Sequence, residues 1–411
     1  MEEKSKLQTL VTAEPVEAAD IIKRGGLVAV PTETVYGLAG NGLNRDAVHR
    51  IYEVKGRPEI KPLSLMVPDA GAFSLYCEDV PPQAGLLAER FWPGPLTIVL
   101  KSKPIVPDIT RAGGDTIGLR CPDHPLTLAL LRSCGLPLAA PSANPSSAPS
   151  PKTAGEVMAY FDGAIDAVID GGPCGIGLES TIIDLSFAPY RILRQGALPQ
   201  DEIADALVSG MTLIGVTGGT GTGKTTALAV LEKLGALAID CDEVYHELTE
   251  TSAELKAELE ARFGRVYSDG RLDRKAIGEV VFADASALAE LNAITHRHVG
   301  NEITRRLRAH AMAGGTLAAI DAIALIESKT ALRCSKVFGV TADIETRAAR
   351  IMSREGISRE YAEKRINAQK TDDFYIENCD AVLRNSGTKE EFAALCETAF
   401  MEVLKNGNKK D

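Results

Sequence analysis

Short apolar runs alternate with amphipathic stretches along the chain, a pattern that predicts an α/β protein. In the first half, the predicted strands cover residues 26–31, 96–100, 116–119 and 181–185, and the predicted helices cover residues 46–54, 127–133 and 201–210. Residues 144–151 (NPSSAPSP) form a loop rich in Pro and Ser. Because this loop interrupts a domain, we expect it to shape a site rather than to act as a linker.

The second half repeats the alternation with longer helices. The predicted strands cover residues 237–240, 317–325, 335–340 and 381–383, and the predicted helices cover residues 225–234, 254–263, 274–282, 286–309, 345–354, 359–370 and 390–404. This order predicts a parallel sheet covered on both faces. The junction near residues 205–211 is short and has no Gly/Ser tract. We therefore expect one domain over residues 1–208 and a second over residues 209–411.

Composition narrows the class of protein. The chain has 411 residues, 45% of them hydrophobic and 25% charged, which is ordinary for a globular protein. No apolar run approaches the ~20 residues of a membrane span, and the N-terminus is polar, so we expect a cytoplasmic protein without a membrane partner. The eight cysteines are scattered without a C-x-x-C pair, which argues against a zinc site or a disulfide framework. A net charge of −11 favours small-molecule chemistry over nucleic-acid binding.

The strongest motif lies in the stretch LIGVTGGTGTGKTTA at residues 213–227. It matches the Walker A pattern, preceded by an apolar strand and followed by a helix, and so predicts a phosphate-binding loop for ATP. We expect Lys224 to lie at the β- and γ-phosphates and Thr225 to offer its hydroxyl to Mg²⁺. The predicted nucleotide-binding residues are Gly219, Thr220, Gly221, Thr222, Gly223, Lys224, Thr225 and Thr226.

Charged residues after this loop suggest catalytic groups. Asp240 and Asp242 follow the next strand, where strand ends meet the phosphate loop. A carboxylate there can take a proton from an attacking hydroxyl or support Mg²⁺, and one of the two can instead cap the helix that follows. Arg350 and Arg354 share one helix face. Such arginines are either solvated surface or part of a lid that neutralises the transferring phosphoryl group.

The region 211–407 resembles dephospho-CoA kinase. The resemblance rests on the phosphate loop, on IDCD at 239–242 and on GRLDR at 270–274. Further residues match in the order in which the family has them, as far as Asn385. It implies a P-loop NTPase-type parallel sheet with a helical lid, and transfer of the γ-phosphoryl group of ATP to the ribose 3′-hydroxyl of dephospho-CoA. It also implies that Asp242 is the general base, with Lys224 catalytic and Arg350 and Arg354 in the lid.

This region departs from the family pattern at two positions. Arg297 stands where a proline usually follows the histidine, and Ile323 replaces a second proline. Because proline restricts the backbone, we expect these departures to affect the acceptor site and not the triphosphate site.

The first half carries clusters of polar residues beside predicted strands. They are PTETVYG at 31–37, KGRP at 55–58, PSAN at 141–144, EST at 179–181 and RQG at 194–196. Each cluster alone is compatible with an ordinary turn or cap. Together, over residues ~10–200, they resemble the YrdC-like family of threonylcarbamoyl-AMP synthases. The family has a twisted open α/β sheet with a concave cleft and no Walker loop. It joins L-threonine, bicarbonate and ATP, and partner proteins pass the product to a tRNA adenosine.

The resemblance also implies site residues in the first half. Lys55, Arg57, Ser142 and Asn144 would hold the nucleotide, while Thr34, Tyr36, Arg120, Ser180 and Arg194 would shape the region of the threonine and the phosphates. Ser147 stands where the family often has glycine, and a positive φ there would strain the loop. Met66 stands where the family often has histidine, which bears on the contact to the amino acid.

Two other readings of the chain stay open. The first half would be a module that binds RNA, including double-stranded RNA, in its cleft and is tethered to a kinase. The net charge of −7 over residues 1–205 counts against this reading, because binding of a phosphate backbone uses Lys and Arg. Alternatively, the kinase would phosphorylate another nucleoside or nucleotide.

Overall fold

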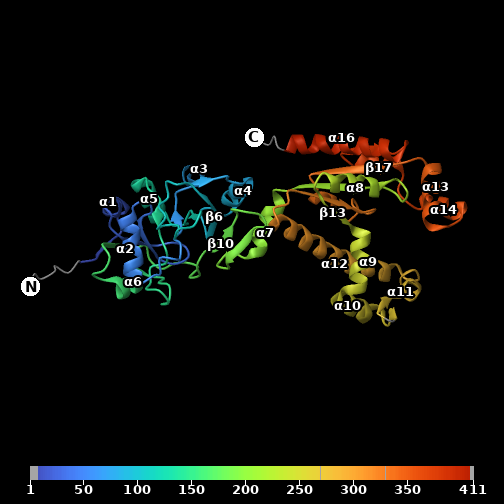
Figure 1. The fold of residues 1–411 in the computed structure, drawn as a ribbon. Helices are drawn as coiled ribbons and strands as arrows, with labels where there is room; N and C mark the ends of the chain where they lie inside the picture. Colours follow the sequence, from blue (N-terminus) through green and yellow to red (C-terminus); the bar gives the residue numbers. More distant parts are fainter. Residues whose placement is uncertain (1–7, 269, 329, 408–411) are drawn as a thin grey trace, which may run out of the picture. The chain divides into compact units, whose positions relative to one another are not determined.

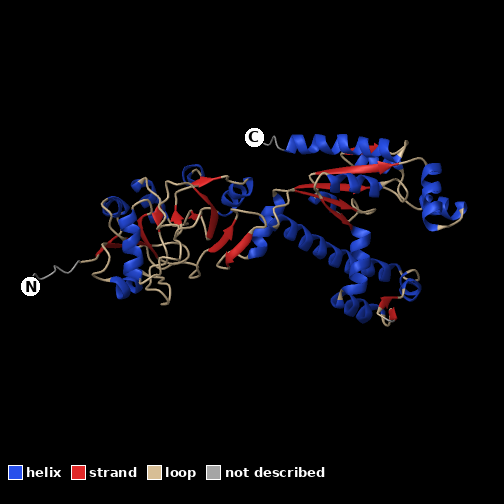
Figure 2. Cartoon of the chain, in the orientation of Figure 1, coloured by secondary structure: helices blue, strands red, loops and turns tan. Residues whose placement is uncertain are grey.

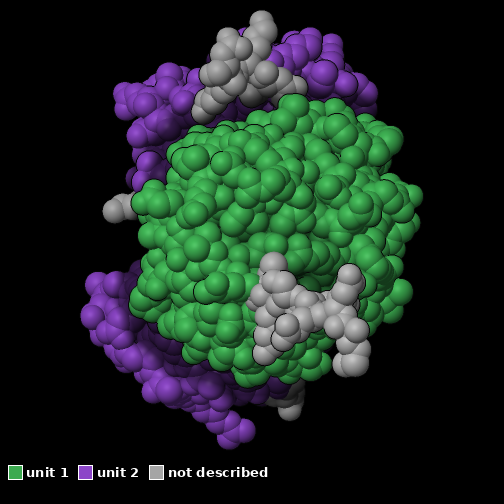
Figure 3. Space-filling model, turned by 90° about the vertical axis from the view of Figure 1, so that its left-hand side faces the viewer, with its two compact units in different colours: residues 1–210, 312–314 green, residues 211–311, 315–411 purple. Residues whose placement is uncertain are grey.

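The computed structural model describes residues 8–268, 270–328 and 330–407, so the first residues of the polar N-terminus lie outside it. Within it, the chain forms two compact units (Figure 3). The first unit comprises residues 1–210 and 312–314, and the second comprises residues 211–311 and 315–411. No helix in the described residues combines the length and apolarity needed to cross a membrane.

The first unit is built on a sheet with both parallel and antiparallel pairs. Within the described residues, its eleven strands follow the order β1-β9-β2-β3-β8-β4-β7-β6-β10-β11, and β5 pairs with β6. The strands are β1 (Leu10–Thr12), β2 (Val28–Val30), β3 (Gly37–Asn41), β4 (Leu65–Met66), β5 (Cys77–Glu78), β6 (Leu96–Ser102), β7 (Thr116–Arg120), β8 (Leu138–Ala139), β9 (Ala167–Ile169), β10 (Thr181–Asp184) and β11 (Arg191–Arg194). Many of them are very short, and long loops join them (Figure 2).

The helices of the first unit are α1 (Pro15–Lys23), α2 (Arg45–Lys55), α3 (Ala72–Tyr76), α4 (Pro82–Phe91), α5 (Pro125–Cys134), α6 (Ala154–Phe161) and α7 (Gln200–Ser209). Helix α2 positions a predicted site residue. The Asn44 side chain caps its start by accepting hydrogen bonds from the backbone N–H groups of Asp46 and Ala47. Its apolar stripe, which includes Val48 and Ile51, is buried. The last turn therefore places Lys55 at a fixed point.

The second unit contains a five-stranded parallel sheet in the order β13-β16-β12-β17-β18. Its strands are β12 (Thr212–Thr217), β13 (Leu237–Asp240), β16 (Leu317–Asp321), β17 (Lys336–Thr341) and β18 (Ala381–Arg384), and a separate hairpin pairs β14 (Tyr267–Ser268) with β15 (Arg271–Leu272). β12 is the central strand, so the chain that leaves it lies over the middle of the sheet's C-terminal edge.

The helices of the second unit are α8 (Lys224–Lys233), α9 (Cys241–Thr251), α10 (Ala253–Phe263), α11 (Arg274–Val281), α12 (Ala285–Met312), α13 (Ile344–Glu355), α14 (Arg359–Asn367), α15 (Asp372–Asn378) and α16 (Lys389–Gly407), with a short 3₁₀ helix at Thr330–Arg333. Helices α8 and α16 lie along the sheet (Figure 1) and share its core, in which Leu231, Phe338 and Phe400 are buried. Helices α9 to α12 form a helical group around the small hairpin (Figure 2).

The structure confirms the predicted fold class and differs from the predicted elements in detail. The strand expected at 317–325 ends at Asp321: the Ala322 N–H makes the last bond of the ladder, to the Val216 carbonyl, and the chain turns from Ile323 onward. The helix expected at 359–370 ends at Asn367, and α15 follows as a separate helix. The strands β3, β8 and β9 were not predicted. β8 and β9 are too short to show a periodicity, and β3 (GLAGN) contains two glycines, which are depleted in strands.

Candidate active sites

The phosphate loop occupies residues 218–223, between the end of β12 and the start of α8. Lys224 is the first residue of α8, and Thr225 and Thr226 follow in its first turn. The predicted nucleotide-binding residues therefore share one loop and one helix N-terminus. The free N–H groups of a helix N-terminus attract an anion, so this arrangement suits a phosphate.

Asp240 and Asp321 end strands beside this loop, and Asp242 follows in the first turn of α9. The Lys224 Nζ is 4.0 Å from the Oδ1 of Asp321, which ends β16 and pairs in register with Asp240 of β13. Asp321 is only 5% exposed, and its Oδ1 has no hydrogen-bond partner in the described residues. Burial raises the pKa of Asp321 to about 7, although the Lys224 ammonium opposes the shift. A buried carboxylate oxygen without a partner fits a site for a cation or a proton.

The sequence left open which of Asp240 and Asp242 caps the following helix, and the structure shows different contacts for the two side chains. Asp240 caps α9, because its Oδ1 accepts hydrogen bonds from the N–H groups of Asp242 and Glu243, 2.8 and 3.2 Å away. The helix therefore begins at Cys241. Asp242 is exposed in the first turn, and its side chain is not used for capping.

Asp242 lines a cavity of about 310 Å³ between α9, α12 and the residues after β16. Polar groups in its wall come from Tyr245, Asn292 and His296, and apolar surface comes from Leu291 and Ile323 among others. A carboxylate at the mouth of a half-apolar cavity beside a phosphate loop can receive the proton of a bound hydroxyl.

The arginines expected in a lid lie on α13. The guanidinium of Arg350 donates to the carbonyls of Gly221 and Thr222 at 3.2 and 3.3 Å, and to the Asn385 Oδ1 at 3.1 Å. The Arg354 side chain is exposed and pairs with Glu355 at 2.6 Å. Arg350 thus contacts the phosphate loop directly, Arg354 does not, and the lid role of both remains a prediction.

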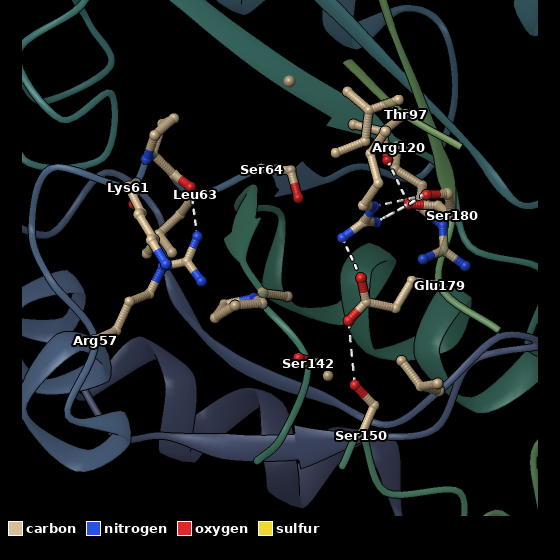
Figure 4. A pocket seen from close by; sticks show the side chains of 18 of the residues that line it. Arg57, Lys61, Leu63, Ser64, Thr97, Arg120, Ser142, Ser150, Glu179 and Ser180 are labelled. Atoms are coloured by element: carbon tan, nitrogen blue, oxygen red, sulfur yellow. Dashed lines mark hydrogen bonds and ion pairs between the residues drawn. The ribbon is translucent and has the colours of Figure 1, made fainter. Parts of the chain in front are cut away.

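The first unit contains a larger cavity, of about 500 Å³. Seven of the nine predicted residues line it, namely Lys55, Arg57, Arg120, Ser142, Asn144, Ser180 and Arg194. Figure 4 shows Arg57 on one wall and Arg120, Ser180 and Glu179 on the opposite wall. The structure therefore gathers cations and hydroxyls from segments far apart in the sequence around one space, which suits a polyanion.

Lys55 forms part of the wall from the last turn of α2. Its Nζ donates to the carbonyls of Ser142 and Asn144, and its own carbonyl accepts from the Ser146 N–H at 2.8 Å. These bonds hold the loop at 142–146 against α2. Burial lowers the pKa of Lys55 to about 8, and the nearby Arg57 guanidinium adds to this effect.

Thr34 and Tyr36 lie behind the wall rather than in it. The Arg120 guanidinium donates to the Thr34 hydroxyl at 2.8 Å and to the Glu33 carboxylate at 2.6 Å. The Tyr36 hydroxyl donates to the Gly172 carbonyl at 2.8 Å. Thr34 therefore orients Arg120, whereas the polar end of Tyr36 is engaged with the backbone outside the set of lining residues.

Arg194 and Ser180 form the opposite wall with Glu179. The Arg194 guanidinium donates to the Ser180 carbonyl at 2.8 Å and pairs with the Glu179 carboxylate. Glu179 also accepts a hydrogen bond from the Ser150 hydroxyl at 3.1 Å (Figure 4). Glu179 thus joins the Pro/Ser loop to β11, and this loop shapes the cavity as the sequence suggests.

Two family models match the chain, one in each unit. A model described as "Telomere recombination", which covers the Sua5, YciO and YrdC proteins, matches residues 20–196. The dephospho-CoA kinase model matches residues 212–391. The threonylcarbamoyl-AMP synthase of Pyrococcus abyssi is 47% identical over 186 residues, which are 45% of this chain and 55% of that protein. A relative from Methanocaldococcus jannaschii is 38% identical over 183 residues, 44% of this chain and 86% of its own length.

For the second half, the dephospho-CoA kinase of Geobacter sulfurreducens is 38% identical over 183 residues, 44% of this chain and 93% of that protein. The chain belongs to both families. Its first half is a YrdC-like threonylcarbamoyl-AMP synthase domain, and its second half is a dephospho-CoA kinase domain. The chain spans about half the length of the first synthases that it matches, 55% of the P. abyssi protein and 57% of the Bacillus subtilis protein.

The sequence motifs did not single out two residues that contact these sites, Glu179 and Arg347. In the synthase domain, Glu179 belongs to the EST cluster, but a lone acidic residue beside predicted anion ligands gave no reason to choose it. In the kinase domain, Arg347 precedes Arg350 by one helical turn, and its side chain is buried against the phosphate loop. The i, i+3 spacing of the two arginines was the available signal.

The four residues that depart from the family patterns can be located in the structure. Ser147 lines the synthase cavity with a φ of 73°, so its backbone is left-handed without being glycine. Met66 lines the same cavity from β4. In the kinase domain, Ile323 lines the cavity beside Asp242, whereas Arg297 is outside it and pairs with Glu258.

Proposed function

We propose that this chain is a bifunctional enzyme. The synthase domain would join L-threonine, bicarbonate and ATP to give threonylcarbamoyl-AMP and pyrophosphate. The kinase domain would phosphorylate the ribose 3′-hydroxyl of dephospho-CoA with ATP. The observation that carries the proposal is that each unit has its own arrangement suited to an anion, a cation-lined cavity of about 500 Å³ in the first and a loop leading into a helix N-terminus beside the Asp242 cavity in the second.

In the kinase domain, the acceptor would bind in the cavity lined by Tyr245, Asn292 and His296. Asp242 would accept the proton of the 3′-hydroxyl as its oxygen attacks the γ-phosphorus. The bond from the γ-phosphorus to the bridging oxygen breaks, and ADP leaves. Lys224 would hold the β- and γ-phosphates, and no covalent enzyme intermediate is needed because positioning and charge supply the catalysis.

The residues beside the phosphate loop fit Mg²⁺, since Asp321 has a buried carboxylate oxygen without a partner and Thr225 presents a hydroxyl in the first turn of α8. We propose that Thr225 and Asp321 would hold the ion. Bound there, Mg²⁺ would neutralise charge on the phosphates. Asp240 is committed to the cap of α9, which leaves Asp242 free for the acceptor.

In the synthase domain, the threonine amine and bicarbonate would first form a carbamate with loss of water. A carbamate oxygen would then attack the α-phosphorus, and pyrophosphate would leave. Lys55, Arg57 and Arg194 would hold the triphosphate, and Ser142, Asn144 and Ser180 would donate or accept hydrogen bonds around it. Arg120, fixed by Glu33 and Thr34, would meet the carboxylate of the threonine.

The product of the synthase is a mixed anhydride and must be consumed by a nucleophile. We propose that tRNA-modification partner proteins transfer the threonylcarbamoyl group to a tRNA adenosine in the cytoplasm. RNA contact at the cleft of the synthase domain would belong to this later step.

One assay of the full chain tests both activities. ATP turnover is measured with threonine plus bicarbonate, and separately with dephospho-CoA, and the products are resolved. We expect pyrophosphate and threonylcarbamoyl-AMP in the first case and ADP and CoA in the second. Salt-dependent RNA binding by the chain without pyrophosphate release would favour the reading of the first half as an RNA-binding module. ADP formed only with another nucleoside or nucleotide would show that dephospho-CoA is not the acceptor.

A further inference from the structure

Arg347 is a buried cation whose side chain contacts the phosphate loop. It lies in the first turns of α13 and is 5% exposed. Its Nε donates to the Thr220 carbonyl at 3.0 Å, and its Nη2 donates to the Gln369 Oε1 at 2.8 Å. Burial lowers the pKa of Arg347. A guanidinium with so little exposure needs these acceptors to offset its loss of water.

Gln369 completes the contact from the segment after α14. Its Oε1 accepts from the Thr220 N–H at 2.8 Å, and its Nε2 donates to the Thr220 hydroxyl at 2.7 Å. The two side chains therefore bind the N–H, the carbonyl and the hydroxyl of Thr220. Because the Thr220 N–H is used by Gln369, it is not free for a phosphate, and later residues of the loop must supply the donors.

The packing around Arg347 leaves no room for a side chain at the neighbouring loop position. A Cβ atom added to Gly219 would lie 2.2 Å from the Arg347 Nη2 and 2.9 Å from the Gln369 Oε1. An alanine at 219 would therefore displace the Arg347 guanidinium and the Gln369 amide, although the backbone angles of this residue suit any side chain. Arg347 and Gln369 are fitted to the loop itself.

We infer that Arg347 and Gln369 form a latch that fixes the Gly219–Thr220 peptide, and that both act as positioning residues for phosphoryl transfer. The inference rests on the proposed kinase function. The latch takes Arg347 from the start of α13 and Gln369 from just beyond the end of α14, so the base of the α13–α14 hairpin is bound to the loop. A loop that is already ordered before ATP arrives loses little conformational entropy when ATP binds. The base of the hairpin therefore does not swing away as a lid.

The test uses the full chain with Arg347→Met and Gln369→Leu, singly and together. Each single variant is expected to raise the KM for ATP of the kinase by roughly 10- to 100-fold and to leave the KM for dephospho-CoA within about twofold. The double variant should be little worse than the worse single variant, because either change opens the same latch. Gln369→Glu keeps acceptors for Arg347 and for the Thr220 N–H, so it should retain most of the affinity.

A second readout does not depend on the reaction. Hydrogen exchange at the Thr220 amide should accelerate at least about tenfold in Arg347→Met and Gln369→Leu and stay slow in Gln369→Glu. Arg359→Met is the matched control, because Arg359 lies on the same hairpin but, among the described residues, forms ion pairs with Glu345 and Glu363 and none with the phosphate loop. It should change neither measurement.

The outcomes separate the two claims. Unchanged exchange and an unchanged KM for ATP would overturn the latch. A loss of kinase activity that raises the KM for both substrates would also overturn it, since that marks general damage to the domain. If the wild-type chain does not phosphorylate dephospho-CoA, the proposed function fails, and the exchange measurement still decides whether Arg347 and Gln369 hold the loop.

Discussion

Lys55 is a cation without a carboxylate partner within ion-pair distance among the described residues, although it is 3% exposed. Two backbone carbonyls accept its hydrogen bonds, and these carry only partial charge. The cost of burying the ammonium is therefore only partly offset in the free protein. An arriving triphosphate would supply the missing charge, which explains how a buried lysine can serve as an anion ligand.

This environment predicts how the synthase responds to pH. As pH rises through about 8, Lys55 loses its proton and its attraction for the triphosphate, so kcat/KM for ATP should fall above that pH. Lys55→Arg keeps its charge and should move the fall to higher pH, even if its maximum rate is lower. Threonine-dependent pyrophosphate release measured from pH 6.5 to 10 checks this. An unchanged profile in Lys55→Arg would assign the titration to another group.

Ser147 predicts a gain in stability. Its φ of 73° costs a non-glycine residue roughly 1 kcal/mol, so Ser147→Gly should stabilise the first unit by about 0.5–1 kcal/mol. The free energy of unfolding of the first unit is measured by chemical denaturation followed through the fluorescence of Trp92. Trp92 is the one tryptophan in the sequence, and it lies in the first unit.

The adjacent serine is the control for that measurement. Ser146 is exposed and does not have a positive φ, so Ser146→Gly should leave stability unchanged or lower it by up to about 1 kcal/mol. Equal effects at the two positions would mean that backbone strain at 147 is not the cause.

At the scale of elements, α2 links the sequence to the synthase cavity. Gly56 ends the helix with a φ of 56°, and Lys55 and Arg57 stand on either side of it. Gly56→Ala meets no atom within 4 Å, so it should fold but destabilise the unit by about 1 kcal/mol. Because both cations shift if the cap opens, kcat/KM for ATP should fall several-fold. Stability that falls without any change in kcat/KM would show that the cap and the site are independent.

The elements also show what could be predicted from sequence. The phosphate loop follows from local spacing, because one strand, one loop and one helix contain it. The contact of Arg347 with Thr220 joins positions 127 residues apart, and no local pattern reports it. The same holds for Tyr36, whose cluster borders the synthase cavity but whose hydroxyl turns to Gly172. Residue types were predictable from motifs, whereas side-chain direction depended on long-range packing.

For the whole molecule, two separate sites predict a clean separation of activities. Lys224→Ala removes the cation at the phosphate loop and should lower ADP formation from dephospho-CoA by at least about 100-fold, with pyrophosphate release within twofold of wild type. Lys55→Met should do the reverse. Both reactions are measured on each full-length variant. If either substitution lowers both activities, the sites are coupled and do not act independently.

The close approach of Arg347 to Gly219 has a consequence for how such chains diverge. An added Cβ at 219 would lie 2.2 Å from the Arg347 Nη2 and 2.9 Å from the Gln369 Oε1, so both side chains would have to move and their bonds to Thr220 would change. A shorter residue at 347 removes the closer of these two contacts. We therefore expect chains that carry alanine at 219 to carry a residue shorter than arginine at 347 more often than chains that keep the glycine.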